Sequence, residues 1–273
     1  MNLLFSINDR FTKPFLTTLY SIYVNTPQTD FDIYILQKEA LKDNDLIHQY
    51  CQSLNMTYHP VIVGENIFEE APASDRWPES IYYRLLAHNF LPETLDKILY
   101  LDADILCINN LSSLYMQDIE DYLYAASSHT RLGFTDTINR LRLGNHELAS
   151  YYNSGVLLMN LDLIRQEVRS EAIFQFIQDN HNYLLLPDQD ILNALYGDKV
   201  FPLADEIYNF DSRLPILYEL LSQNEYNLDW VVNNTVILHF CGKDKPWQEG
   251  RSTKFSFLYK HYQSLSTRLF QSL

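Results

Sequence analysis

The first 63 residues alternate between short apolar runs and segments with helical spacing, and this alternation limits the possible folds more than any other feature. The apolar runs at 2–7, 31–36 and 58–63 have the length of strands, and the segments 13–26 and 41–55 have the length of helices. Strands that alternate with helices in this way usually lie parallel in one sheet. The pattern predicts an α/β fold with a mostly parallel central sheet and helices on both of its faces.

The remainder of the chain continues this alternation. We expect helices at 79–91, 161–180 and 188–197, and strands at 98–101, 122–127, 154–160 and 235–242, the last of which completes the set. Residues 64–78 contain turn formers without a sustained period, which predicts a mobile loop. The polar segment 128–150, with Arg131, Arg140 and Arg142, is expected to cover a site. No break in composition argues for a second large domain.

Charge and cysteine content exclude several classes of protein. A formal net charge of −15 argues against a general nucleic-acid binder. The three cysteines, Cys51, Cys107 and Cys241, are too few and too widely spaced for a disulfide framework or a zinc finger. The N-terminus lacks the pattern of a secretory signal, and no window approaches the roughly 18 apolar residues of a membrane span. These features predict a reducing, cytoplasmic compartment.

The C-terminal segment 251–273 differs from the acidic remainder. It contains Arg251, Lys254, Lys260 and Arg268 and no acidic residue, and aromatic and aliphatic residues are interleaved with these charges. The pattern predicts a basic amphipathic helix. Such a helix can make peripheral contact with an anionic membrane, or it can pack on the acidic body of the protein, and the sequence leaves both options open.

Two aspartates follow a strongly apolar run in the segment "KILYLDADILC" at 97–107. The run reads as a strand buried on both faces, which places Asp102 and Asp104 at the edge of the sheet. Residues two apart in a strand point the same way, so one cation can bridge both carboxylates. Such oxygen ligands suit Mg²⁺ or Mn²⁺. The alternative is that Asp102 caps a turn and that Asp104 is a solvated loop residue.

His239, in "VILHFC", is the candidate third ligand, and an imidazole in the set favours Mn²⁺. The alternative is a core histidine whose hydrogen bonds are satisfied. The turn "CGKDKPW" that follows offers a glycine and two lysines, groups that suit a pyrophosphate. Together these features point to a metal-assisted site for a phosphate-containing substrate.

With these motifs, the sequence resembles the family 8 retaining glycosyltransferases, in particular the lipopolysaccharide α-galactosyltransferase type. The resemblance lies in six ordered segments: "LLFSINDRF", "YYRLLAHNFLP", "KILYLDADILC", "YYNSGVLLMNLDLIR", "LPDQDILN" and "ILHFCGKDKPW". It implies a GT-A fold, a single nucleotide-binding α/β domain with an attached acceptor region. We expect this domain over 1–250, followed by the basic amphipathic tail over 251–273. The resemblance further implies that a hexose moves from UDP-galactose or UDP-glucose to a glycan, glycolipid or glycoprotein, with Mn²⁺ (Mg²⁺ is possible) and retention of the α configuration.

The resemblance also implies roles for individual residues. The metal ligands would be Asp102, Asp104 and His239, with Ala103 between the two acids in the nucleotide site. The uracil would be bound by Asn8 and Phe11, and Arg84 would reach the sugar and phosphate region. The donor hexose would be surrounded by Asn153, Asp188 and Gln189, and the diphosphate would be held by Gly242 and Lys245. Asn8 departs from the family's usual aspartate, although an amide can both donate to uracil and accept from it.

Structural alternatives exist for several of these residues. Arg84 could pair with Glu79 on its own helix, and Asn153 could be a turn residue. Asp188 lies at a helix start, where an aspartate is a common N-cap. Lys245 could be a solvated surface charge.

The chemistry has alternatives as well. Gln189 is a poor nucleophile, which favours front-face attack by the acceptor. Lys245 would then stabilise the leaving group. A second option is that Asp188 acts as a covalent nucleophile. Loops 64–78 and 242–250 are expected to order over the donor and exclude water. A nucleotidyl or phosphoryl transferase and a non-catalytic UDP-sugar-binding module are the alternative functions, and the absence of a P-loop argues against the former.

Overall fold

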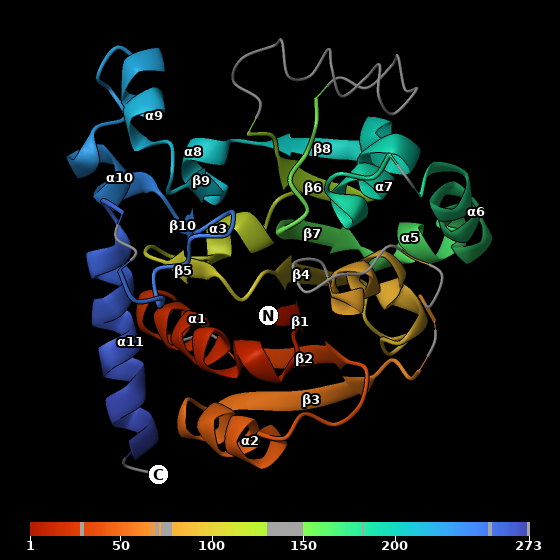
Figure 1. Cartoon of the computed structure of the whole chain (residues 1–273), viewed down its shortest axis with the longest axis horizontal. Coiled ribbons are helices and arrows are strands. Elements are labelled where there is room, and N and C mark those ends of the chain that lie inside the picture. Colours follow the sequence, from red (N-terminus) through yellow and green to blue (C-terminus); the bar gives the residue numbers. More distant parts are fainter. Residues whose placement is uncertain are drawn as a thin grey trace.

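The structure of the chain is a computed structural model, shown in Figure 1, which describes residues 1–27, 30–65, 67–68, 71, 78–129, 150–181, 183–250 and 253–271. Its first half contains β1 (Asn2–Ser6), η1 (Asp9–Phe11), α1 (Thr12–Asn25), β2 (Phe31–Gln37), α2 (Asn44–Ser53), β3 (Met56–Ile62), η2 (Glu79–Asn89), β4 (Lys97–Leu101), β5 (Ile105–Cys107), α3 (Ser112–Tyr115) and β6 (Tyr124–Ser127). Its second half contains β7 (Val156–Asn160), α5 (Leu161–Glu167), α6 (Ser170–Asn180), α7 (Pro187–Tyr196), η3 (Gly197–Lys199), β8 (Val200–Leu203), α8 (Asp205–Tyr208), β9 (Phe210–Asp211), α9 (Pro215–Leu221), α10 (Leu228–Asn234), β10 (Ile237–His239) and α11 (Ser256–Gln271).

Within the described residues, the main sheet has seven strands in the order β3-β2-β1-β4-β7-β6-β8. The strands β3, β2, β1 and β4 are parallel, as the sequence predicts. β7 runs antiparallel to both of its neighbours, β4 and β6, and β8 pairs parallel with β6. The prediction of a mostly parallel α/β sheet is therefore confirmed, and Figure 1 shows the strands in this order from β3 at the bottom to β8 at the top.

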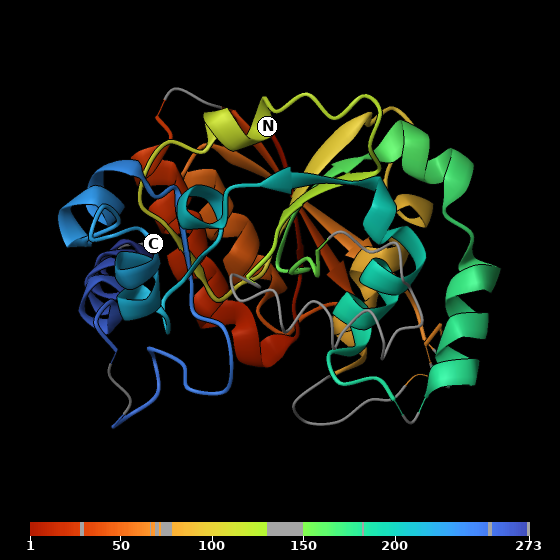
Figure 2. The same cartoon turned by 90° about the horizontal axis from the view of Figure 1, so that it is seen from above.

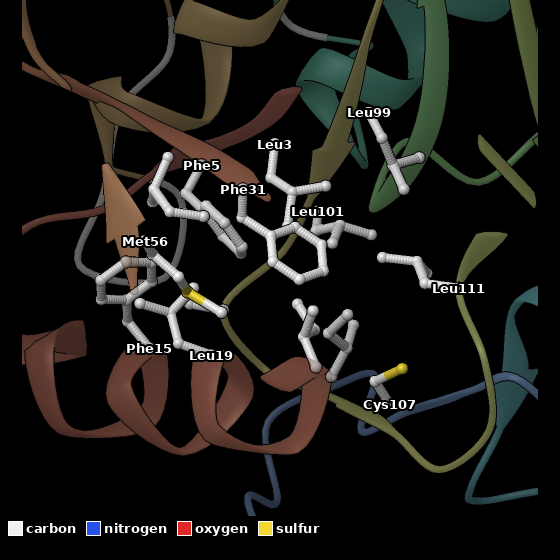
Figure 3. Packing of buried hydrophobic residues seen from close by; sticks show 14 of the residues in the cluster. Leu3, Phe5, Phe15, Leu19, Phe31, Met56, Leu99, Leu101, Cys107 and Leu111 are labelled. Atoms are coloured by element: carbon white, nitrogen blue, oxygen red, sulfur yellow. The ribbon is translucent and has the colours of Figure 1, made fainter. Parts of the chain in front are cut away.

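Helices cover both faces of this sheet, so its central strands are buried on both sides. In the view from above, α1 and α2 lie on one side of the strands and α5–α7 on the other (Figure 2). Successive residues of β4 enter opposite cores: Leu99 and Leu101 pack with α1, while Ile98 and Tyr100 pack toward η2. Figure 3 shows the first core, where aromatic and aliphatic residues from β1 and β2 meet those of α1.

The last predicted strand differs from expectation in its partners. The segment 235–242 forms the short strand β10, which belongs to a second sheet with the order β5-β10-β9 instead of completing the main sheet. It pairs antiparallel with β5 and parallel with β9. β5 follows β4 directly after the two aspartates, so this second sheet places His239 opposite Ile105, next to Asp104.

The single helix expected at 161–180 is two helices, because Val168 and Arg169 have extended backbone between α5 and α6. The buried residues Leu161, Ile164 and Val168 continue one helical phase, and Ile173 in α6 starts another. The break lets both helices bury their apolar residues in the same core.

The helix expected at 79–91 is the 3₁₀ helix η2, which has a kink at Leu86. Its central residues are buried because it packs against β1, β2, α5 and α7 at once. Tertiary packing on several sides therefore overrides the regular α-helical geometry.

The C-terminal helix is present as α11, and it packs along α1 (Figure 1). Tyr259 is buried in a third core, and Ser266 is hydrogen bonded to Tyr50 at 2.6 Å. Among the described residues, no helix combines the length and the apolar character needed to cross a membrane. The three arginines of 128–150 and most of the loop 64–78 lie outside the described residues, so the expectations for these segments stay predictions.

Candidate functional site

The turn that carries the two aspartates is fixed by hydrogen bonds to its backbone. The Thr18 hydroxyl of α1 lies 3.1 Å from the carbonyl oxygen of Ala103 and 2.9 Å from that of Ile105. The Asp102 N–H donates to the Gly155 carbonyl at 2.8 Å, and the Phe240 N–H donates to the Asp104 carbonyl at 3.0 Å. Because three separate elements hold this turn, both carboxylates have defined directions.

Arg84 is the cationic partner of one aspartate. It is almost fully buried, its Nη2 lies 3.0 Å from Asp102 Oδ1, and its Nε lies 3.4 Å from Asp188 Oδ2. Its guanidinium stacks over the Tyr100 ring at 4.3 Å, and the Tyr100 hydroxyl donates to Asp102 at 2.8 Å. Glu79 pairs with Lys38 instead, so the alternative pairing of Arg84 within its own helix is wrong.

Asp104 has two cationic neighbours. Lys245 Nζ contacts its Oδ2, and His239 Nε2 lies 3.3 Å from its Oδ1. Burial alone would raise the pKa of the Asp104 carboxyl, but the charges of Lys245 and His239 outweigh it and hold this pKa well below its usual range. Asp104 is buried, so the alternative of a solvated loop residue is wrong, and so is the alternative of a solvated Lys245.

His239 directs one ring nitrogen at the aspartates. Its Nε2 lies 3.8 Å from Asp102 Oδ2, and one ligand atom from each of Asp102, Asp104 and His239 lies within 4.8 Å of the others. Burial alone would lower the pKa of the imidazole, but the neighbouring Cys241 and Asp104 raise it well above its usual value. Asp102 keeps 26% of its side chain exposed, which leaves the group accessible from solvent. Two carboxylates and an imidazole form a donor set suited to Mn²⁺.

Asp188 and Gln189 lie at the start of α7, directly beside Arg84. Asp188 accepts a hydrogen bond from the Ser154 hydroxyl at 2.8 Å, and burial raises the pKa of its carboxyl although Arg84 partly offsets this shift. The N-cap position of α7 is Leu186, and the Asp190 side chain accepts from the N–H groups of Leu185 and Leu186 just before the helix. The N-cap alternative for Asp188 is therefore wrong.

Asn153 belongs to a chain of amide side chains that the sequence did not reveal. It donates to Gln189 Oε1 at 3.1 Å, and its own Oδ1 receives the Asn209 amide at 3.0 Å. Asn209 Oδ1 in turn lies 2.8 Å from His239 Nδ1. Asn209 follows the short helix α8 in an irregular stretch, where no periodic signal marks it.

Gly155 is the second residue that sequence reasoning missed. A Cβ at this position would lie 2.4 Å from His239 Cε1 and 2.5 Å from Asp102 Oδ2. Only glycine therefore lets the chain pass this close to both groups just before β7 begins. In the sequence, the glycine directly before the apolar run of "YYNSGVLLMN" is the feature that indicates a close approach.

Asn8 and Phe11 lie where β1 leads into η1, at the same edge of the sheet. Asn8 accepts from the Arg10 N–H, and Phe11 meets the Trp247 ring edge-on with 6.0 Å between centroids. Trp247 belongs to the loop 242–250, so this loop reaches η1, just after β1. Gly242 has a φ of +85° and lies against Arg213, whose Nη1 would be 2.9 Å from an added Cβ.

A second group of metal-ligating side chains lies beside the first. His129, Asp211 and Cys241 also have ligand atoms within 4.8 Å of one another, and the His129 ring lies 6.4 Å from that of His239. Both carboxylate oxygens of Asp211 accept hydrogen bonds from Arg213, at distances from 2.6 to 3.1 Å. Arg213 therefore already neutralises the Asp211 carboxylate of this second group.

Known proteins match this chain over nearly its whole length. A 1,2-glucosyltransferase of lipopolysaccharide from Escherichia coli is 27% identical over 271 residues, covering 97% of this chain and 78% of the relative. General stress protein A from Bacillus subtilis is 25% identical, covering 97% and 93%.

A solved structure of the galactosyltransferase LgtC, in complex with donor and acceptor sugar analogs, superposes with a TM-score of 0.82. The identity is 21%, and the match covers 97% of this chain and 96% of that one, so this similarity establishes the GT-A fold. The family model described as glycosyl transferase family 8 matches residues 2–250. The chain is therefore a member of glycosyl transferase family 8.

Proposed function

We propose that this family 8 enzyme transfers a hexose from UDP-glucose or UDP-galactose to a glycan, glycolipid or glycoprotein, with Mn²⁺ and with retention of the α configuration. The observation that carries the proposal is the convergence of Asp102, Asp104 and His239 at the edge of the sheet, beside Arg84 and Asp188. The names of the relatives support a hexose, since they include glucosyl- and galactosyltransferases acting on lipopolysaccharide.

The residues present fit a divalent cation. Two carboxylates and the imidazole Nε2 of His239 meet, with Nε2 at 3.3 Å from Asp104 Oδ1, and the ammonium of Lys245 occupies part of the space beside Asp104. Bound Mn²⁺ (or Mg²⁺) would supply a Lewis acid that offsets the negative charge of the diphosphate leaving group. To hold the cation, His239 would give up to solvent the proton that the neighbouring charges favour on it, and Lys245 would release Asp104.

Lys245 is well placed to stabilise the leaving group. Its Nζ also donates to the Phe240 carbonyl at 2.9 Å, so the side chain lies in the mouth of the glycine turn. When the donor binds, the Lys245 ammonium can leave the Asp104 carboxylate and bind a diphosphate oxygen. Its positive charge then lies next to the negative charge that develops on the leaving group. Gly242 lets the same turn adopt its left-handed backbone.

The remaining candidates would bind the donor. Asn8 and Phe11 would hold the uracil, Ala103 would line the nucleotide site, and Arg84 would orient the sugar and phosphate region. Asn153, Asp188 and Gln189 would surround the hexose. These assignments rest on family membership and on the position of each residue around the acid pair.

We favour front-face attack over a covalent intermediate. Asp188 Oδ2 is engaged by Ser154 and Arg84, an arrangement that holds the carboxylate in place to bind sugar hydroxyls. Gln189 offers an amide, which is a poor nucleophile. The acceptor hydroxyl would enter on the side of the leaving group and give its proton to a phosphate oxygen.

The C-terminal helix supports a further part of the proposal, peripheral contact with an anionic membrane on the cytoplasmic side. Phe257 is 82% exposed, and Lys254, Lys260 and Arg268 are also exposed. The three cysteines are free thiols, which suits a reducing compartment.

The test is a screen of UDP-sugars for slow hydrolysis, which requires no known acceptor. We expect release of UDP from UDP-galactose or UDP-glucose with Mn²⁺ and none with a chelator. The variants Asp102→Ala and Asp104→Ala should lose Mn²⁺-dependent binding of UDP. Undiminished metal-dependent binding in both variants would refute the assigned ligands, and consumption of a nucleoside triphosphate would favour phosphoryl transfer.

A further inference from the structure

One backbone N–H sets the direction of hydrogen-bond donation along the chain of amide side chains formed by Gln189, Asn153 and Asn209. The Gly155 N–H donates to Asn153 Oδ1 at 3.0 Å. A backbone N–H can only donate, so the Asn153 atom that receives it must be the amide oxygen. The same oxygen lies 3.0 Å from the Asn209 side chain, which must therefore present its NH₂ group.

This direction determines the tautomer of His239. With its NH₂ group on Asn153, Asn209 presents its oxygen to His239 Nδ1 at 2.8 Å. Nδ1 must carry a proton and donate it. Nε2 is then the nitrogen that faces Asp102 and Asp104 and that can offer a lone pair to a cation.

The other end of the chain orients Gln189. The NH₂ group of Asn153 donates to Gln189 Oε1 at 3.1 Å, so the NH₂ group of Gln189 is turned away from Asn153. Asn209 itself is fully buried, and its backbone is held at both ends. Its N–H donates to the Asp205 carbonyl at 3.0 Å, and its carbonyl lies 2.6 Å from His129 Nε2.

We infer that Asn209 is a positioning residue that fixes the imidazole of His239 for metal binding and couples it to the amides of Asn153 and Gln189 at the donor sugar. This inference rests on the proposed function, because it takes His239 as a metal ligand. Hydrogen-bond partners of metal-ligating histidines set both the tautomer and the ring orientation. The coupling means that the metal and the hexose bind to parts of one hydrogen-bonded unit.

A merely structural role would predict a different result. Asn209 could matter only because it satisfies buried polar groups, in which case its replacement would lower stability without changing ligand affinity in the folded protein. Two variants separate the roles. Asn209→Leu removes both hydrogen bonds, whereas Asn209→Asp keeps an acceptor for His239 and places an oxygen against Asn153 Oδ1.

The readout is Mn²⁺ affinity, measured by calorimetry in the presence of UDP, together with the affinities for UDP-hexose and for UDP. In Asn209→Leu we expect Mn²⁺ affinity to fall about tenfold or more, the usual effect of losing such a partner. In Asn209→Asp we expect Mn²⁺ affinity to stay within about threefold of wild type, because a carboxylate also orients a ligating histidine. The preference of this variant for UDP-hexose over UDP should fall about tenfold, because the link to Asn153 is broken.

Asn25→Leu is the matched control, since Asn25 makes amide hydrogen bonds to Ser21, Cys107 and Tyr262 away from the site. It should lower the melting temperature and leave Mn²⁺ affinity unchanged. If Asn209→Leu keeps wild-type Mn²⁺ affinity while Asp102→Ala loses Mn²⁺ binding, the role of Asn209 is refuted and the proposed metal site stands. Wild-type affinity in Asp102→Ala would instead overturn the proposed metal site. If Asn209→Leu does not fold, an unchanged UDP-hexose preference in Asn209→Asp would overturn the coupling.

Discussion

Two neighbouring groups in this molecule each bring three metal-ligating side chains within 4.8 Å, yet they differ in how their charges are balanced. In the first, Asp102, Asp104 and His239, the balancing cations come from separate elements, and one carboxylate is partly open to solvent. In the second, His129, Asp211 and Cys241, the aspartate is wholly buried and bound through both oxygens by Arg213. Ligand type alone therefore does not define a cation site, because the lone pairs must also be available.

Removing one acid from each group should give the largest contrast. Asp104→Ala is expected to weaken Mn²⁺ binding at least about 100-fold, because it removes a direct ligand. Asp211→Asn should change Mn²⁺ affinity by less than about threefold and cost about 1–3 kcal/mol of stability through the lost hydrogen bonds to Arg213. Calorimetry with UDP and urea unfolding measure the two effects. Equal losses of Mn²⁺ affinity in both variants would contradict the distinction between the groups.

Gly155→Ala tests how tightly the first group is packed. The added methyl would overlap both His239 and Asp102, so we expect Mn²⁺ affinity to fall about tenfold or more. A variant that keeps wild-type affinity would show that the group tolerates a displacement. Mn²⁺ titration of the folded variant provides the measurement.

Lys245→Ala tests whether the lysine beside the first group serves the leaving group. We expect kcat to fall about 100-fold, because a charge aimed at the departing diphosphate is lost, while KM changes by less than about threefold. Lys199→Ala is the control, since this partly exposed lysine pairs with Glu167 outside both groups, and it should leave both constants unchanged. An unaltered kcat in Lys245→Ala would refute its role.

The smallest effect comes from a histidine outside both groups. Burial and the nearby Arg165 lower the pKa of His88 to about 4. The unfolded chain binds this proton more readily, so stability falls as the pH drops below about 6.5 toward 4. Between pH 6.5 and 5.5 we expect a loss of about 1 kcal/mol from this residue. In urea unfolding, His88→Asn should reduce that loss, and the same pH dependence with and without His88 would contradict the assignment.

The sequence predicts the fold well where a pattern repeats. The run Ile98–Leu101 is apolar on both faces because helices cover both sides of the sheet, and the acids follow where the strand ends. The pattern fails where structure is irregular or where local packing decides. The break after α5 appears only as a phase shift between Ile164 and Ile173, and β10 pairs in a second sheet that its short apolar run does not indicate.

The candidate site was predictable to a similar extent. Asp102, Asp104, Arg84 and His239 lie in recognisable segments, and the structure brings them together. Asn209 and Gly155 were missed for different reasons. Asn209 acts through a contact 30 residues away in the chain, and the need for a glycine at 155 arises only once β7 lies against His239.

We propose that the first group, and not the second, holds the catalytic cation. The most direct test is anomalous diffraction at the manganese edge from crystals grown with Mn²⁺ and UDP. We expect one strong peak within about 2–2.5 Å of ligand atoms from Asp102, Asp104 and His239. No peak at these residues, or a peak at His129, Asp211 and Cys241 in its place, would refute the assigned cation site.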